Sequence, residues 1–439
     1  MRIYLTSLGC KLNQSEMDAL ATQLTENGHR VVSVPSEADL CVLNTCAVTH
    51  VAAQKSRQAL RRLHRENPQA QLIVTGCYAE LAPHELDSLP GVVSAIGNQE
   101  KGRLEEVIGE RARDQADIRL DSTLLHRPPS APSMPHPRTR ALVKIQDGCD
   151  NACTYCIIRV ARGPQHSRPI EQVLAEVQAL VSGGYQEIVL TGVHIGAYGQ
   201  DRQSDQGGDN LWALVQRILV ETDVPRLRLS SIEPWDLAEH AFGLWDDSRL
   251  CRHLHLPLQS GSDATLRRMA RRYDTAEFAA LLNAARATIP DLAVTTDVIV
   301  GFPGESEAQF AESLEFVRSQ QFARVHVFPY SMRAGTLAAQ MPEQVPPAVK
   351  SHRARTMRAL TAVSEQTFRR QFVGRTLTVL WETPQPGREG PVWSGLTGNY
   401  LRVYATSTEH LANTLTRTRL IALTEGGLRG QIVREQSGE

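Results

Sequence analysis

Three cysteines within eight residues are the feature that most constrains this chain. Cys149, Cys153 and Cys156 lie in the run Gly-Cys-Asp-Asn-Ala-Cys-Thr-Tyr-Cys, and thiols so close on one loop can converge on a single metal centre. A structural zinc site needs a second ligand pair at a characteristic downstream spacing, whereas His166 is the only candidate nearby. The spacing therefore favours an iron–sulfur cluster that leaves one iron open to a substrate or cofactor. The alternative is a set of buried structural thiols.

The first hundred residues alternate short apolar runs with amphipathic stretches, which is the pattern of a doubly wound parallel α/β domain. The expected strands are 3–8, 31–34, 40–43 and 72–74, and the expected helices are 13–27 and 52–66.

Three further cysteines each follow one of these strands. Cys10, Cys46 and Cys77 come directly after apolar runs, and the loops beyond the carboxyl ends of parallel strands gather at one edge of the sheet. We therefore expect the three thiols to meet there, although any one of them alone could be a small buried side chain. Cys41, within a strand, and Cys251, at the entry to another, are interpreted as core residues.

A proline-rich segment from 127 to 140 separates this domain from the rest of the chain. It carries five prolines and several arginines but no acidic residue, and such composition favours an extended linker. The expected division is an N-terminal domain at 1–110, a linker at 111–139, a central domain at 140–371 and a small C-terminal domain at 372–439.

The central domain repeats the strand–helix alternation and is predicted to be a partial TIM-type (β/α)6 barrel, whose reactive residues sit at strand carboxyl ends. The expected strands are 141–145, 188–190, 227–230, 253–258, 294–300 and 325–328, with helices such as 170–181 and 305–319. The cysteine loop follows the first strand and opens onto the barrel mouth. Candidate cofactor-binding residues at equivalent positions are Tyr155, Thr191, Gly192, Glu233 and Gln259.

Two basic stretches are candidate phosphate contacts. Lys and Arg total 47 against 48 acidic residues, a net charge of -1, so nucleic-acid binding would depend on local patches. Charge runs usually coat a solvated helix face, which is the alternative. The tail, with expected strands at 376–381, 398–404, 414–423 and 430–433, fits a small nucleic-acid-binding β-barrel. The candidate residues are Arg267, Arg268 and Arg271, and on a helix at 349–372 Lys350, Arg353, Arg369 and Arg370.

The cysteines and the apolar runs also indicate the compartment. Eight cysteines are too few and too unevenly spaced for a disulfide framework in a chain of 439 residues, and the first ten residues lack the apolar run of a signal peptide. Apolar runs are only of strand length, too short to span a bilayer. We expect a reduced, cytoplasmic protein without membrane segments.

Taken together, these motifs resemble the radical S-adenosylmethionine (SAM) methylthiotransferase family. The run from Cys149 to Cys156, with an aromatic residue before the third cysteine, is similar to the radical SAM signature, and the resemblance covers all three domains. Four segments are most similar to family members that act on threonylcarbamoyladenosine in bacterial tRNA: Ser7–Gln14, Arg228–Pro234, His255–Gly261 and Gly395–Tyr400.

The resemblance implies an enzyme that adds a methylthio group to C2 of N6-threonylcarbamoyladenosine at tRNA position 37. Cys149, Cys153 and Cys156 would hold a 4Fe–4S cluster that binds SAM. Cys10, Cys46 and Cys77 would hold an auxiliary 4Fe–4S-type cluster that carries the inserted sulfur. A second SAM would supply the methyl group, and an electron donor such as flavodoxin or ferredoxin would supply electrons. The C-terminal barrel would be a TRAM-like domain that binds tRNA. The protein would be a monomer.

The sequence departs from the family pattern after the third cysteine, where Ile157-Ile158-Arg159 replaces the usual proline with an arginine. The alternative substrates are isopentenyladenosine in tRNA and an aspartate of a ribosomal protein. A third possibility, a metal-bound RNA-binding protein without catalysis, is distinguished by whether the loaded protein cleaves SAM.

Overall fold

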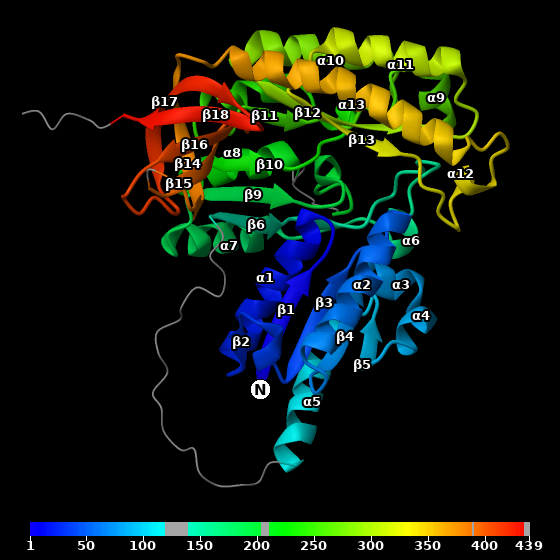
Figure 1. The fold of residues 1–439 in the computed structure, drawn as a ribbon, viewed down its shortest axis with the longest axis vertical. Coiled ribbons are helices and arrows are strands. Elements are labelled where there is room, and N and C mark those ends of the chain that lie inside the picture. Colours follow the sequence, from blue (N-terminus) through cyan, green and yellow to red (C-terminus); the bar gives the residue numbers. More distant parts are fainter. Residues whose placement is uncertain (119–138, 203–209, 389, 434–439) are drawn as a thin grey trace, which may run out of the picture.

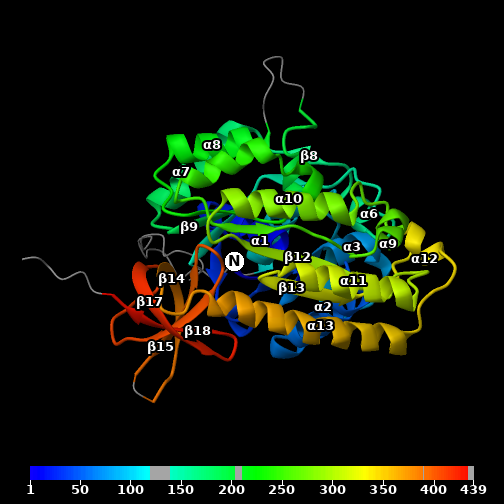
Figure 2. The ribbon, with the colours of Figure 1, turned by 90° about the horizontal axis from the view of Figure 1, so that it is seen from above.

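The computed structural model describes residues 1–118, 139–202, 210–388 and 390–433. Figure 1 shows an N-terminal domain in blue packed beneath a central barrel in green and yellow, with a small red and orange barrel beside it. Figure 2, seen from above, shows the long helix α13 (Pro347–Arg370) running along the central barrel to the small one. The described helices include none that is long and apolar enough to cross a membrane.

The N-terminal domain is built on a parallel five-stranded sheet, as the alternating pattern predicted. The strand order is β2-β1-β3-β4-β5, and every pairing is parallel. Each residue of the central strand β3 is buried, as expected for a sheet with helices on both faces. The strands are β1 (Arg2–Ser7), β2 (Arg30–Val32), β3 (Leu40–Thr45), β4 (Gln71–Gly76) and β5 (Val92–Ile96).

Short loops connect these strands to helices, and this placement brings the cysteines to the carboxyl edge of the sheet. The helices are α1 (Lys11–Glu26), α2 (His50–Glu66), α3 (Cys77–Leu81), α4 (Pro83–Asp87) and α5 (Leu104–Ile118). Helix α5 continues beyond residue 110, where the linker was expected to begin. The proline-rich part of that linker lies outside the described residues.

The central domain contains the predicted (β/α)6 barrel as two three-stranded parallel sheets, β6-β9-β10 and β11-β12-β13. Isolated bridges between 227 and 250 and between 231 and 255 join the two sheets. The strands are β6 (Arg140–Lys144), β9 (Glu187–Thr191), β10 (Leu227–Leu229), β11 (His253–His255), β12 (Ala293–Val300) and β13 (Arg324–Pro329). The outer helices are α7 (Ile170–Ser182), α8 (Leu211–Glu221), α10 (Thr275–Thr288), α11 (Glu307–Gln320) and α13.

The C-terminal domain is a closed five-stranded barrel, ordered β14-β15-β16-β18-β17. The sequence pattern predicted four strands and missed β15 because Gly395 weakens its strand signal. That glycine is required, since a Cβ on Gly395 would lie 2.6 Å from the backbone oxygen of Leu380 on the neighbouring strand. The strands are β14 (Thr376–Gln385), β15 (Val392–Thr397), β16 (Arg402–Thr406), β17 (Leu415–Thr424) and β18 (Gly427–Ile432).

Two buried arginines of the central barrel connect it to the small barrel. Arg226 and Arg228 both contact Glu187 on the adjacent strand, at 2.5 and 2.7 Å. Their remaining donors reach the small barrel, where Arg226 bonds the Leu396 oxygen and Arg228 the Gly398 oxygen, each at 3.0 Å. The small barrel is therefore fixed against the base of the central one.

Candidate metal centres and active site

The first cysteine triad lies in a loop that is held at several points. The loop leaves β7 (Gln146–Asp147) and enters the short helix α6 (Ile158–Arg162). Only glycine fits at 148, where φ is +66° and a Cβ would lie 1.8 Å from the Pro164 oxygen. The Thr154 hydroxyl donates to the Arg268 oxygen at 2.8 Å, and the Cys149 amide donates to the Gly163 oxygen at 3.2 Å.

The three thiols of this triad form no disulfide. Burial raises the pKa of Cys156 to about 12, and the neighbouring Cys153 and Cys149 add to that rise. Metal binding would replace the thiol protons, and three thiolates from one loop are a typical ligand set for a 4Fe–4S cluster. The residues present therefore fit the cluster that the sequence predicts. His166 is exposed on β8 (His166–Ser167), 3.9 Å from Asp201.

Glu233 and Arg271 form an ion pair beside the cysteine loop. The same guanidinium lies 3.5 Å from the Cys153 sulfur and 3.4 Å from the Tyr155 hydroxyl. Arg271 is buried, so the prediction that it contacts RNA phosphate is wrong. The charge of Arg271 is instead paired inside the barrel with Glu233, which lies in the loop after β10.

His194 was missed by sequence reasoning and also lies beside the cysteine loop. Its Nδ1 is 4.0 Å from the Cys149 sulfur, and its Nε2 is 2.5 Å from Asp236. Burial disfavours the imidazolium, but Asp236 and Cys149 outweigh that effect and raise the pKa of His194 to about 9. The sequence signal that could have identified His194 was its position three residues beyond β9, just after Thr191 and Gly192.

The other candidate cofactor contacts also surround the barrel mouth. Thr191 is the last residue of β9 and is buried, and Gly192 lies against Gln146. Gln259 has a left-handed backbone with φ of 64°, and its amide donates to the Asp297 oxygen at 2.8 Å. The Tyr155 ring meets Phe302 edge-on, with centroids 6.5 Å apart.

The second cysteine triad is assembled from three loops of the N-terminal sheet. Cys10 precedes α1 and is exposed, whereas Cys46 and Cys77 are buried. Burial raises the pKa of Cys46 to about 11, and Cys77 and Cys10 add to that rise. Three free thiols at one sheet edge again fit a cluster. Cys41 and Cys251, expected to be core residues, are both buried.

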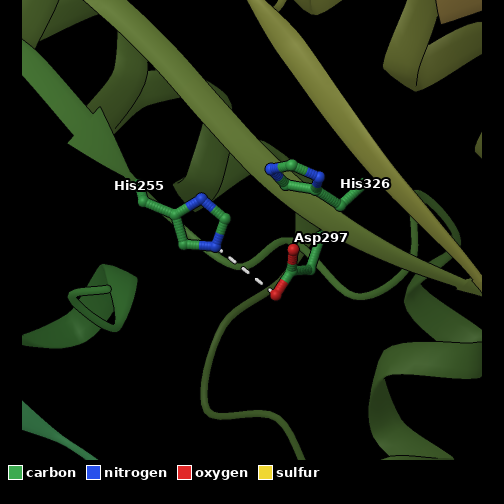
Figure 3. Close-up of side chains that lie close together, drawn as sticks. All are labelled: His255, Asp297 and His326. Atoms are coloured by element: carbon green, nitrogen blue, oxygen red, sulfur yellow. Dashed lines mark ion pairs between the residues drawn. The ribbon is translucent and has the colours of Figure 1, made fainter. Parts of the chain in front are cut away.

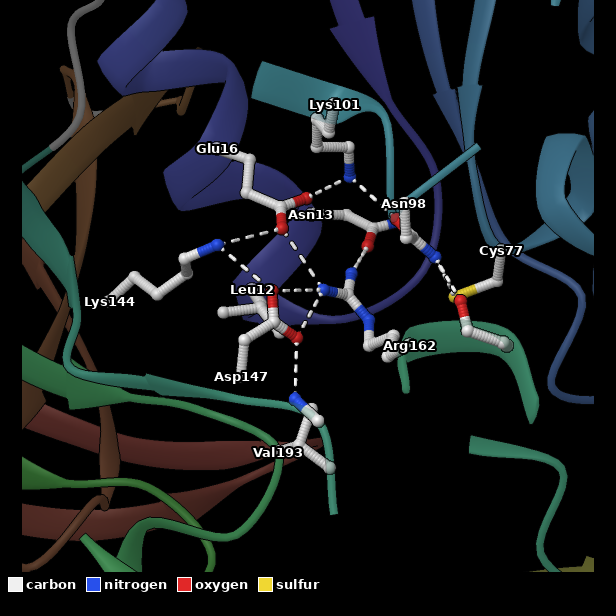
Figure 4. Close-up of polar contacts among 12 residues, drawn as sticks. Leu12, Asn13, Glu16, Cys77, Asn98, Lys101, Lys144, Asp147, Arg162 and Val193 are labelled. Atoms are coloured by element: carbon white, nitrogen blue, oxygen red, sulfur yellow. Dashed lines mark hydrogen bonds and ion pairs between the residues drawn. The ribbon is translucent and has the colours of Figure 1, made fainter. Parts of the chain in front are cut away.

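A charge network lies between the second triad and the residues that flank the first triad (Figure 4). Arg162 at the end of α6 contacts Glu16 at 3.0 Å, Asp147 at 2.8 Å and the Asn13 side chain at 2.6 Å. Asn13 accepts from the Cys10 thiol at 3.7 Å. Because Asp147 and Arg162 flank the first triad and Asn13 touches the second, Arg162 links the two sites.

Two more side chains extend this network. Lys101 contacts Glu16 at 2.5 Å and Asn98 at 2.9 Å, and Asn98 donates to the Cys77 sulfur at 3.5 Å. Burial raises the pKa of Glu16, but Lys101, Arg162 and Lys144 outweigh it and hold that pKa well below its ordinary value. Glu16 is therefore ionised and balances the cations around it.

The remaining basic residues that were candidate phosphate contacts differ in how exposed their side chains are. Arg353 is buried and paired with Glu305 at 2.7 Å, so its predicted contact with RNA phosphate is also wrong. This ion pair joins α13 to the turn that precedes α11. Arg267 and Arg370 are exposed, whereas Arg268 bonds Gln309, Lys350 bonds the Tyr330 oxygen and Arg369 pairs with Glu365.

Family models match both cysteine-bearing domains. Residues 2–97 match the model described as uncharacterized protein family UPF0004, and residues 143–317 match the radical SAM superfamily. Membership of that superfamily implies a 4Fe–4S cluster and SAM.

Curated relatives cover nearly the whole chain. The threonylcarbamoyladenosine tRNA methylthiotransferase of Bacillus subtilis is 38% identical, covering 98% of this chain and 95% of its own length. That of Chlamydia pneumoniae is 36% identical, covering 98% and 97%. The tRNA-2-methylthio-N6-dimethylallyladenosine synthase of Maricaulis maris is 32% identical, covering 98% and 97%.

These matches and the cysteine-loop barrel define the class of protein: the chain belongs to the radical SAM methylthiotransferase family. Among these near-full-length relatives, it is more similar to the two threonylcarbamoyladenosine tRNA methylthiotransferases than to the dimethylallyladenosine synthase. Among solved structures, the radical SAM methyltransferase TsrM from Kitasatospora setae is similar, with a TM-score of 0.56, 14% identity and 77% of each chain covered. That likeness concerns the fold.

Proposed function

We propose that this chain is a transferase that adds a methylthio group to C2 of N6-threonylcarbamoyladenosine at tRNA position 37. The observation that carries the proposal is the presence of both cysteine triads in a chain 38% identical over nearly its full length to a threonylcarbamoyladenosine tRNA methylthiotransferase. The structural likeness supports the radical SAM fold on which this chemistry depends.

The two triads have separate roles in the proposal. Cys149, Cys153 and Cys156 hold the SAM-binding 4Fe–4S cluster, and Cys10, Cys46 and Cys77 hold a second cluster. Bound cofactors supply single-electron chemistry, because an unactivated aromatic C–H has no proton that a general base can remove near neutral pH. The protein contributes positioning and the exclusion of water.

The residues around the first triad orient the cofactor. The Glu233 carboxylate, held by Arg271, is available to the amino group of SAM. Tyr155, Thr191, Gly192 and Gln259 complete the proposed cofactor site. His194 brings positive charge to the Cys149 side of the loop, where it balances the thiolate charge.

tRNA binding is assigned to the C-terminal barrel and to the basic residues that remain accessible. Arg267 and Arg370 are exposed and supply charge for phosphates. We also propose a flavodoxin- or ferredoxin-type electron donor, a monomeric state and a cytoplasmic location.

Nucleoside analysis tests the proposal. The cluster-loaded enzyme is incubated with SAM, reductant and tRNA that carries threonylcarbamoyladenosine, and the digested tRNA is examined by mass spectrometry. The expected product is 2-methylthio-N6-threonylcarbamoyladenosine. A product only on dimethylallyladenosine tRNA would instead favour the activity named for the Maricaulis maris relative, and deoxyadenosine without either product would contradict both.

A further inference from the structure

Two histidines and an aspartate converge on one wall of the central barrel, apart from both cysteine triads. His255 comes from β11, Asp297 from β12 and His326 from β13 (Figure 3). One possible ligand atom from each of the three lies within 4.8 Å of those of the other two. Because the three strands are adjacent and parallel, a rigid sheet holds these side chains in place.

The spacing matches that of metal ligands. Nε2 of His255 lies 3.4 Å from Oδ2 of Asp297. Ligand bonds of about 2.1 Å in a tetrahedral site place two ligand atoms about 3.4 Å apart. Two imidazoles and one carboxylate also form a set that leaves coordination positions open.

A further hydrogen bond orients His255 for this role. Its Nδ1 lies 2.9 Å from the Thr295 hydroxyl, which also lies 3.0 Å from Nε2 of His253. When Nδ1 donates to that hydroxyl, the lone pair of Nε2 points toward Asp297. Metal-binding histidines almost always have such a partner on the second ring nitrogen.

The cluster is accessible and faces the N-terminal domain. The side chains of His255 and Asp297 are 14% and 29% exposed, so an ion can reach them. The His253 ring stacks on Tyr400 with centroids 4.7 Å apart, and the Lys11 ammonium lies 6.0 Å from the same Tyr400 ring. Lys11 opens helix α1, so a side chain of the N-terminal domain reaches this side of the central barrel.

The types of ligand restrict the ion. The two imidazoles of His255 and His326 disfavour Mg²⁺, which prefers oxygen ligands. They leave ions that bind imidazole strongly, such as Zn²⁺ and Co²⁺.

We propose that His255, Asp297 and His326 form a binding site for a first-row transition-metal dication, with Thr295 orienting His255. The site is separate from the iron–sulfur centres and has at least one coordination position for an oxygen ligand. The proposal of this metal site does not depend on the identity of the enzyme's substrate.

Co²⁺ uptake by the cluster-loaded enzyme without tRNA tests this site, because the clusters occupy the six triad cysteines. Elemental analysis and low-temperature EPR spectroscopy of high-spin Co²⁺ measure the binding. We expect one bound Co²⁺ per chain, at least ~100-fold weaker binding in Asp297→Ala and His326→Ala, and ~10–100-fold weaker binding in Thr295→Val. His352→Ala, which removes an exposed histidine of α13, is the matched control and should bind as the wild type does.

Circular dichroism and cluster iron content establish that each variant is folded. The proposal is overturned if the wild-type enzyme takes up no Co²⁺, or if Asp297→Ala and Thr295→Val bind it as tightly as the His352→Ala control. A raised KM for tRNA in Asp297→Ala, without any Co²⁺ binding by the wild type, would show a substrate contact instead and would equally overturn it.

Discussion

The two cysteine triads differ in how the chain brings their side chains to one place. Cys149, Cys153 and Cys156 lie on one loop, within eight residues of sequence. Cys10, Cys46 and Cys77 are far apart in sequence and come to one edge of the sheet because β1, β3 and β4 are parallel neighbours. The first site therefore depends mainly on its own loop and the second on the whole N-terminal fold.

Removing a ligand of the first triad is expected to have the largest effect. Cys153→Ala should abolish both deoxyadenosine formation and methylthiolation, because SAM then has no cluster to bind. Chromatography of SAM cleavage products and tRNA nucleoside analysis measure the two activities. Cys251→Ala, at a buried cysteine outside both triads, is the control, and retained deoxyadenosine formation in Cys153→Ala would contradict the assignment.

Removing a ligand of the second triad should separate the two activities. Cys46→Ala is expected to keep SAM cleavage measurable and to abolish sulfur insertion. The same two measurements apply, with Cys41→Ala as the matched control from the same strand and loop region. Loss of both activities in a folded Cys46→Ala enzyme would show that the two triads do not have separate roles in SAM cleavage and sulfur insertion.

Breaking the network between the triads should have an intermediate effect. Arg162→Met leaves Glu16 and Asp147 with Lys144 as their remaining shared cation, and losing one side of a buried ion pair costs up to ~3–5 kcal/mol. Thermal unfolding should show a lower Tm, and methylthiolation should fall more than SAM cleavage. Arg159→Ala, an exposed residue of the same helix, should change neither, and equal behaviour of the two variants would refute the linking role of Arg162.

A smaller effect is expected at the ion pair beside the first triad. Glu233→Gln removes a charged partner of SAM worth ~1.5–3 kcal/mol, so KM for SAM should rise ~10–100-fold. Steady-state kinetics of deoxyadenosine formation measure this change. A variant with unchanged KM for SAM would remove Glu233 from the cofactor site.

The smallest effect is expected for an exposed phosphate contact outside both triads. Arg370→Ala should weaken tRNA binding a few-fold and lower the slope of its salt dependence by ~1, because each phosphate contact releases about one counterion. Filter binding at several salt concentrations measures the slope, and SAM cleavage without tRNA should not change. An unaltered slope would place Arg370 outside the tRNA interface.

The sequence predicted the fold class well because periodicity and turn residues are local signals. It predicted four of the five strands of the parallel N-terminal sheet and the six barrel strands. It did not predict β5, and β15 was missed because Gly395 weakens the pattern. The sequence also shows that Arg271 and Arg353 are charged, but it does not show that they are buried. Their burial depends on contacts with Glu233 and Glu305, which come from distant segments. A charge pattern on one helix face does not reveal what packs against it.

The sequence by itself determined the first triad, because eight consecutive residues contain all three of its cysteines. It also determined which strands precede the second triad. Only the tertiary structure decided which side chains surround these sites: Arg162 reaches Glu16 and Asn13 across a domain boundary, and His255, Asp297 and His326 meet across three strands. Such contacts follow from sheet register and domain packing, which are set by the burial of the whole core rather than by any local motif.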